Sequence, residues 1–146
     1  KLVSALPRRP RGRACIVLTH DYAGQAEWAA QLAARTGSEH LDLLTHFAED
    51  PALAGDIETF STGSLFDFLA NRRSSPVLII SGLEFLIATW AGQSDAIEQF
   101  ASRIEHWNKA PALLFVLQYD QTLATRRFGR HRQHTFVVDQ NDTLKL

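Results

Sequence analysis

The sequence predicts an α/β fold, a three-layer sandwich whose mainly parallel sheet has about five strands. The first observation is that predicted strands and helices alternate from one end of the chain to the other, which favours parallel strands joined by helical crossovers. The second is a continuous apolar run at 76–80, typical of a parallel strand covered on both faces. The third is size, because 146 residues, 45% of them hydrophobic, suit one domain around one core.

Two strands and one helix are predicted in the first third of the chain. Residues 14–19 form a short apolar run that indicates a buried strand. Residues 25–36 show helical periodicity, and the face expected to point inward consists of Trp28, Ala29, Leu32 and Ala33. A second strand is expected at 40–44, and the pattern over 45–60 indicates only a short helix around 51–57.

The remaining elements continue the alternation. A helix is expected at 65–72, capped by Ser64, and a longer one at 94–108. A buried strand at 113–117 lies between the long helix and two final elements, a helix at 121–128 and a strand at 135–138. Large aromatic residues are expected in the core or an interface rather than around a cofactor, among them Trp28, Trp90, Phe100 and Trp107.

Charge is distributed unevenly although the net charge is only -1. Residues 1–13 carry five bases and no acid, and residues 121–134 carry four arginines and no acid. The other 119 residues therefore hold six of the 15 bases and all 16 acids, a net charge of -10. This polarity predicts an anionic or acidic partner. The segment 1–13 also contains two prolines and a glycine, so we expect a basic arm or lead-in before a single domain at 14–146.

Composition excludes several classes of protein. No apolar run approaches the ~20 residues that a membrane-spanning helix needs, so no membrane association is expected. The lone Cys15 lies in a predicted buried strand and cannot form an internal disulfide, which favours a cytoplasmic location and a core role for the thiol.

The turn after the first strand occupies the place of a phosphate-binding loop but lacks most of its residues. A Walker A loop requires glycine, four residues, a second glycine, lysine, and then serine or threonine. Aligned on that pattern, Thr19 replaces the first glycine, Gly24 matches the second, Gln25 replaces the lysine and Ala26 replaces the hydroxyl residue. The lysine would neutralise the β- and γ-phosphates and the hydroxyl would bind magnesium. The sequence therefore predicts that nucleotide hydrolysis is lost.

The apolar strand near residue 80 has the position of a Walker B strand. Such a strand ends in an acid that binds magnesium, and many examples add a catalytic glutamate shortly afterwards. Here Ser81 occupies the acid position, and Glu84 follows three residues later. Glu84 would have little to act on without the lysine and the metal ligands, and the start of a helix is an equally good reason for a glutamate there.

The order of these elements resembles that of the additional-strand P-loop NTPases, the RecA-like and AAA+ group. The resemblance covers residues 14–140 and includes the degenerate loop, the segment SGLEFL at 81–86 and the strand LLFVLQYD at 113–120. The chain is somewhat similar to the small P-loop protein family of BREX phage-defence loci, and more loosely to SulA-like accessory proteins with a RecA fold. In that group a polar residue at the position of Gln118 senses the γ-phosphate. The missing lysine, hydroxyl and acid mean that ATP hydrolysis is not implied for this chain.

A basic segment near the carboxyl terminus is the strongest surface signal. Arginines and an aromatic residue can follow a phosphate backbone and stack on a base, and the segment contains Arg126, Arg127, Phe128, Arg130 and Arg132. Arginine also pairs with acids at protein interfaces, so the acidic body of a second copy is an equally good partner. In AAA+ proteins an arginine near this place reaches into a neighbour's site. Nucleic acid, a protein partner and a solvated basic turn all remain open.

Other enzyme chemistry has little support in the sequence. The pair His20-Asp21 at the end of the first strand is the best alternative, but a turn in which Asp21 caps the helix start is the preferred explanation, because no nucleophile is near it in the sequence. His131 and His134 have metal-ligand spacing but lie among arginines, which repel a cation, so no metal and no cofactor are expected. The favoured function is a non-catalytic pseudo-NTPase adaptor or assembly subunit, acting at DNA in phage defence or genome maintenance. A nucleic-acid-binding module and a weak ATP-binding switch are the alternatives.

Overall fold

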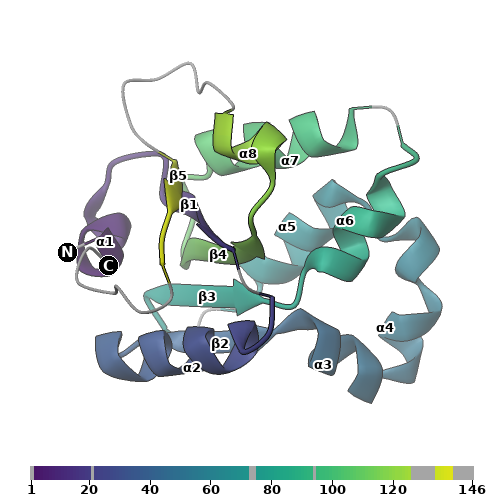
Figure 1. Cartoon of the computed structure of the whole chain (residues 1–146), viewed down its shortest axis with the longest axis horizontal. Coiled ribbons are helices and arrows are strands. Elements are labelled where there is room, and N and C mark those ends of the chain that lie inside the picture. The colour runs from purple at the N-terminus through teal and green to yellow at the C-terminus, as the bar shows by residue number, and fades with distance from the viewer. Residues whose placement is uncertain (1, 21, 73–74, 94, 126–133, 140–146) are drawn as a thin grey trace.

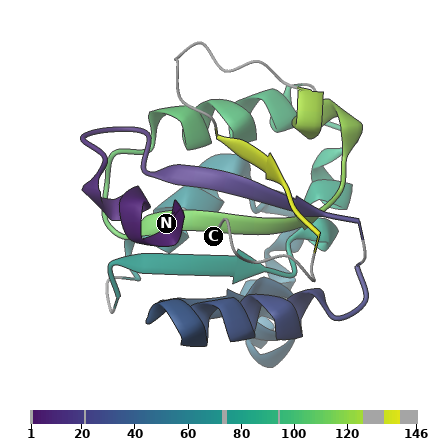
Figure 2. The same cartoon turned by 60° about the vertical axis from the view of Figure 1, so that its left-hand side comes forward.

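Five parallel strands form the centre of the molecule. The computed structural model describes residues 2–20, 22–72, 75–93, 95–125 and 134–139. Within them the sheet has the order β2-β3-β4-β1-β5, and every neighbouring pair is parallel. Figure 2 shows β3, β4, β1 and β5 side by side. The strands are β1 (Ala14–Thr19), β2 (Glu39–Asp42), β3 (Val77–Ser81), β4 (Ala112–Gln118) and β5 (Thr135–Val137). Because all of them run the same way, their carboxyl ends meet at one edge of the sheet.

Helices cover both faces of the sheet, which confirms the predicted three-layer α/β architecture (Figure 1). One face packs against α1 (Leu2–Ala5), the 3-10 turn η1 (Leu6–Arg8) and α2 (Gln25–Thr36). The other face packs against a larger set of helices. They are α3 (Leu43–Glu49), α4 (Pro51–Gly55), the 3-10 turn η2 (Ile57–Thr59), α5 (Thr62–Ala70), α6 (Glu84–Trp90), α7 (Ala96–His106) and α8 (Gln121–Thr125).

The two-residue period of the strands divides the core into two layers. In β1, Ile16 and Leu18 face the larger helical layer, and Cys15 and Val17 face α2. All four side chains are completely buried, as a continuous apolar run in a parallel sheet predicts. Cys15 is buried in the core, as expected, and this burial raises the pKa of its thiol to about 12.

Aromatic side chains fill the larger core layer. The rings of Phe66, Phe100 and Phe115 pack against one another. Their centroids are 5.9 Å apart for Phe66 and Phe100, 5.7 Å for Phe66 and Phe115, and 5.2 Å for Phe100 and Phe115. The fully buried Trp90 donates its indole N–H to the carbonyl of Phe60 over 2.8 Å, which satisfies its polar atom. The expectation that the large aromatic residues lie in the core is confirmed, since Trp28, Trp90, Phe100 and Trp107 are all buried.

Several element boundaries differ from the sequence expectation. The strand expected at 40–44 ends at Asp42, and Leu44 belongs to α3. The segment 45–60 contains the short helix expected around 51–57, as α4, and also most of α3 and the turn η2. The cap of α5 is Ser61, whose hydroxyl accepts from the N–H of Ser64, so the predicted cap is instead a residue of the first turn. Helices of seven and five residues are too short to show a clear helical period, so the pattern indicated only one of them.

The amino-terminal segment is helical rather than extended. Residues 2–8 form α1 and η1, and Val3 and Leu6 are buried in the core layer shared with α2. Two apolar side chains at a spacing of three residues are enough to anchor a single turn to the sheet. Within the described residues, the structure contains no helix with the length and apolar character needed to cross a bilayer.

Candidate functional site

The candidate site lies at the carboxyl edge of the sheet, where α/β folds usually bind ligands. Thr19, Ser81 and Gln118 end the strands β1, β3 and β4, and the N–H of Tyr119 donates to the carbonyl of Thr19 over 2.7 Å. The turn after β1 leads into α2, whose first residue is Gln25. Gly24 precedes it with φ +76°, a conformation that favours glycine over every L residue. This turn therefore explains Gly24 without reference to a ligand.

Gln25 is buried and its side chain spans the site. Only 3% of the residue is exposed to solvent. Its Oε1 accepts from the N–H of Gly82, directly after β3, over 3.1 Å, and its Nε2 donates to Oε2 of Glu84 over 2.8 Å. Both polar atoms of the amide are thus bonded within the protein. The residue at the position of the Walker lysine connects the turn after β1 to the end of β3.

Glu84 completes this connection. It is the first residue of α6, and its Oε2 also accepts from the N–H of Gln118, at the end of β4, over 2.8 Å. Three strand ends are therefore joined by the residues Gln25, Gly82, Glu84 and Gln118, which we call the carboxyl-edge bridge. A carboxylate that accepts two hydrogen bonds at the amino end of a helix is in a favourable electrostatic environment. The other oxygen of Glu84, Oε1, is buried and has no hydrogen-bond partner.

Ser81 is engaged with the neighbouring edge strand. The residue is fully buried, and its hydroxyl lies 2.7 Å from Nε2 of His40 on β2. Asp42 is paired in register with Ser81 and lies two residues after His40, so the three side chains share one face of the sheet. Burial lowers the pKa of His40, and the charge of Asp42 opposes this effect in part. The position of the Walker acid therefore holds a neutral hydroxyl bonded to a half-buried histidine.

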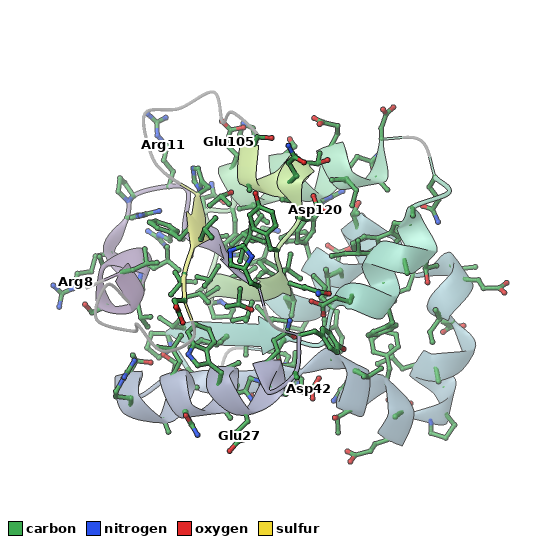
Figure 3. The ribbon with its side chains drawn as sticks, viewed as in Figure 1. Arg8, Arg11, Glu27, Asp42, Glu105 and Asp120 are labelled. Carbon is green, nitrogen blue, oxygen red and sulfur yellow. The ribbon has the colours of Figure 1, made fainter. Side chains whose placement is uncertain are left out.

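A hollow of about 260 Å³ lies beside the degenerate loop. Its walls come from the loop, from the first turn of α2, and from the segments after β2 and β3; they comprise Tyr22, Ala23, Gly24, Gln25, Ala26, Glu27, Asp42, Leu44 and Gly82. Figure 3 labels Asp42 and Glu27, the two carboxylates of this lining. Burial raises the pKa of the Tyr22 phenol, and the charges of Glu84 and Asp42 raise it further. The amino end of α2 would attract an anion, but these carboxylates oppose one.

The remaining sequence candidates fall into two groups. The ring of His20 stacks on that of Tyr119, with centroids 4.8 Å apart, whereas Asp21 lies outside the described residues. The basic segment with Arg126, Arg127, Phe128, Arg130 and Arg132 also lies outside them, so its role stays a prediction. Among the residues that the structure describes, no group of three His, Cys, Asp or Glu side chains could hold a metal ion.

The contribution of β2 was not predicted from the sequence. His40 was expected at the start of a strand without a role in the site, and no role was expected for Asp42. The signal available was their spacing of two, which puts both side chains on one face of a strand. That face could have been matched to Ser81 only with knowledge that β2 and β3 are neighbours.

Neither a protein-family model nor a curated protein nor a solved structure matches this chain.

The carboxyl-edge bridge predicts a marked cost for removing the Gln25 amide. In Gln25→Ala the N–H of Gly82 and the carboxylate of Glu84 each lose a partner, so we expect a loss of about 1–3 kcal/mol in the free energy of unfolding. Urea denaturation followed by tryptophan fluorescence measures it. Gln31→Ala, at an exposed position of the same helix, is the control and should change stability by less than about 0.5 kcal/mol. Equal effects of the two substitutions would contradict the bridge.

His40 predicts a specific dependence of stability on pH. Its pKa is lowered in the folded protein, so the unfolded chain takes up a proton first as the pH falls. The free energy of unfolding should therefore decrease as the pH falls below ~6.5, and the decrease should end below the lowered pKa of the folded state. We expect a smaller decrease in His40→Gln, measured by urea denaturation across that range. The same pH profile in both proteins would show that His40 does not titrate in this way.

Proposed function

We propose that this chain is a non-catalytic adaptor or assembly subunit built on a P-loop NTPase-like domain. The carboxyl-edge bridge is the observation that carries the proposal, because protein side chains bond to one another where the resembled group would bind phosphate and magnesium. The strand order supports it as well. An additional strand, β4, lies between β1, which precedes the loop, and β3, which precedes Glu84.

The hydrolytic chemistry lacks each of its charged parts. Gln25 supplies a neutral amide whose oxygen and nitrogen are both bonded, so it offers no positive charge to a phosphate. Ala26 has no oxygen to bind a metal. Ser81 supplies a hydroxyl already bonded to His40 instead of a carboxylate. Restoring the chemistry would require changes at three positions.

Glu84 has a structural role in this account. The resemblance would make it the catalytic glutamate, but its Oε2 accepts from Gln25 and from the backbone of β4. These two hydrogen bonds hold the carboxylate oxygen against groups of the protein rather than against a water molecule. Glu84 then holds the strand ends together, and the fold remains intact without a nucleotide.

The partner follows from the distribution of charge. The two basic segments, 1–13 and 121–134, carry nine bases and no acid. The rest of the chain has a net charge of -10. Such a chain can bind a second copy of itself through opposite charges or bind a separate polyanion. We favour a protein assembly, with DNA as the place of action and phage defence or genome maintenance in the cytoplasm as the setting.

The absence of hydrolysis is tested with the purified chain. With magnesium and ATP at millimolar concentration, we expect phosphate release equal to that of Glu84→Gln, because no hydrolysis depends on this carboxylate. Any common background then reflects contamination, which is measured with a mock purification. Release by the wild type that Glu84→Gln abolishes would contradict the proposal.

The assembly surface is tested by converting Arg126, Arg127, Arg130 and Arg132 together to alanine. Sedimentation equilibrium at low salt should show self-association of the wild type and its loss in the variant, since paired charges weaken when one partner is removed. The matched control converts the same four residues to lysine and should retain association. A wild type that is monomeric but binds labelled duplex DNA, with binding lost in the alanine variant, would instead support the nucleic-acid module.

A further inference from the structure

A second and larger hollow is lined by Glu84 and by none of the loop residues 22–27. Its volume is about 330 Å³, at the lower end of the range for small-molecule sites. It is formed by α6, α7, the end of β4 and the start of α8, and its lining comprises Glu84, Ile87, Ala91, Ile97, Leu117, Gln118, Tyr119, Asp120, Thr122 and Leu123. The hollow therefore stands at the carboxyl edge of a parallel sheet, beside the carboxyl-edge bridge.

The base of this hollow is apolar and belongs to the core. Leu117 and Leu123 are almost fully buried, and Ile87 and Ile97 are partly buried and pack against the same core layer. These side chains are fixed by their neighbours, so the hollow is formed by packed elements of the fold. An apolar part of a ligand would gain burial here.

The charged groups of the lining are all acidic. Glu84 and Asp120 are its carboxylates, and no lysine, arginine or histidine is among the described residues that line it. Oδ1 of Asp120 accepts from the N–H of Leu123 over 2.9 Å, which holds this carboxylate at the rim as the cap of α8 (Figure 3). Two carboxylates without a base disfavour an anion and favour a cation.

Glu84, which lines the hollow, has one carboxylate oxygen without a hydrogen-bond partner. Oε2 is engaged in the bridge, whereas Oε1 is buried without a hydrogen-bond partner. A buried acceptor without a partner destabilises the structure, more so when it belongs to a carboxylate. A donor with positive charge is the group that would satisfy it best.

An exposed aromatic ring adds to the same preference. Tyr119 lines the hollow, is 39% exposed, and its ring is stacked on His20. The stack restrains the orientation of the ring. The electron-rich face of an aromatic ring attracts cations, especially where water is partly excluded.

We infer that this hollow binds a small organic cation, one that carries an amidinium, guanidinium or ammonium group on an apolar body. The apolar body packs on the base, and the cationic nitrogen lies between the carboxylates of Glu84 and Asp120. This binding is independent of the proposed adaptor function, because it requires neither a phosphate site nor a partner.

Two ligands of the same shape test the inference. Benzamidine is planar and cationic, and benzamide is its neutral counterpart. Titration of the full-length ¹⁵N-labelled protein should show saturable shifts with benzamidine, including those of the Gln118 and Leu123 amides, and binding at least about tenfold weaker with benzamide. Equal affinity for the two ligands would overturn the inference. So would the absence of any shift at about 10 mM benzamidine, a concentration that reveals even millimolar affinity.

Variants locate the site. Asp120→Asn keeps a residue that can cap α8 but removes the rim charge, so benzamidine should bind about three- to tenfold more weakly in a folded protein. Glu84→Gln should weaken binding further, and Ala91→Phe, which adds a ring at the exposed rim, should abolish it. Unchanged affinity in both Asp120→Asn and Ala91→Phe would place the binding elsewhere and contradict the inference.

Discussion

The carboxyl edge of this protein depends on the hydrogen bond from the Gln25 amide to the Glu84 carboxylate. Three parallel strands end side by side here, and each exposes backbone groups that a bound ligand or another part of the chain must satisfy. The amide of Gln25 reaches the backbone after β3, and Glu84 reaches the backbone at the end of β4. Without their mutual bond over 2.8 Å, both side chains would be partly buried polar groups with fewer partners.

This bond also explains why the missing lysine, hydroxyl and acid form a consistent set. A lysine at position 25 would bring a charge suited to phosphate, and a carboxylate at position 81 would bring one suited to a metal. Gln25 and Ser81 bring neutral groups instead, and each is bonded to a side chain of the protein. The negative charges of Asp42 and Glu27 beside the loop then have no lysine or arginine opposite them among the described residues that line the hollow. A different pair of carboxylates, Glu84 and Asp120, lines the larger hollow, where we infer a cation.

The sequence predicted the architecture more reliably than the contacts of the site. The strands at β1 and β3 and the helix α2 were found because long apolar runs and helical periodicity are strong signals. The turn of Gly24 and the helix that begins at Glu84 could also be read from residue types. The helices α3 and α4 were unclear because segments of seven and five residues are too short to show a clear helical period. The buried turn with Val3 and Leu6 was hidden by the surrounding prolines and arginines.

The partners of Gln25, Ser81 and Glu84 could not be predicted from one sequence. Each bond joins residues far apart in the chain, and the pair His40 and Ser81 depends on which strands are neighbours in the sheet. A local pattern carries no information about strand order beyond the general preference for short right-handed connections. The substitutions at the loop were visible, but only the fold shows that the amide of Gln25 satisfies the groups around it.

Calorimetric titration of the purified chain with ATP and magnesium tests the central claim most directly. If the carboxyl-edge bridge replaces the phosphate site, the titration should give only the heat of dilution at millimolar nucleotide. Saturable, magnesium-dependent binding that weakens in a variant with an altered loop, such as Gly24→Val, would contradict the account, because it would show that the loop still binds phosphate despite Gln25, Ala26 and Ser81.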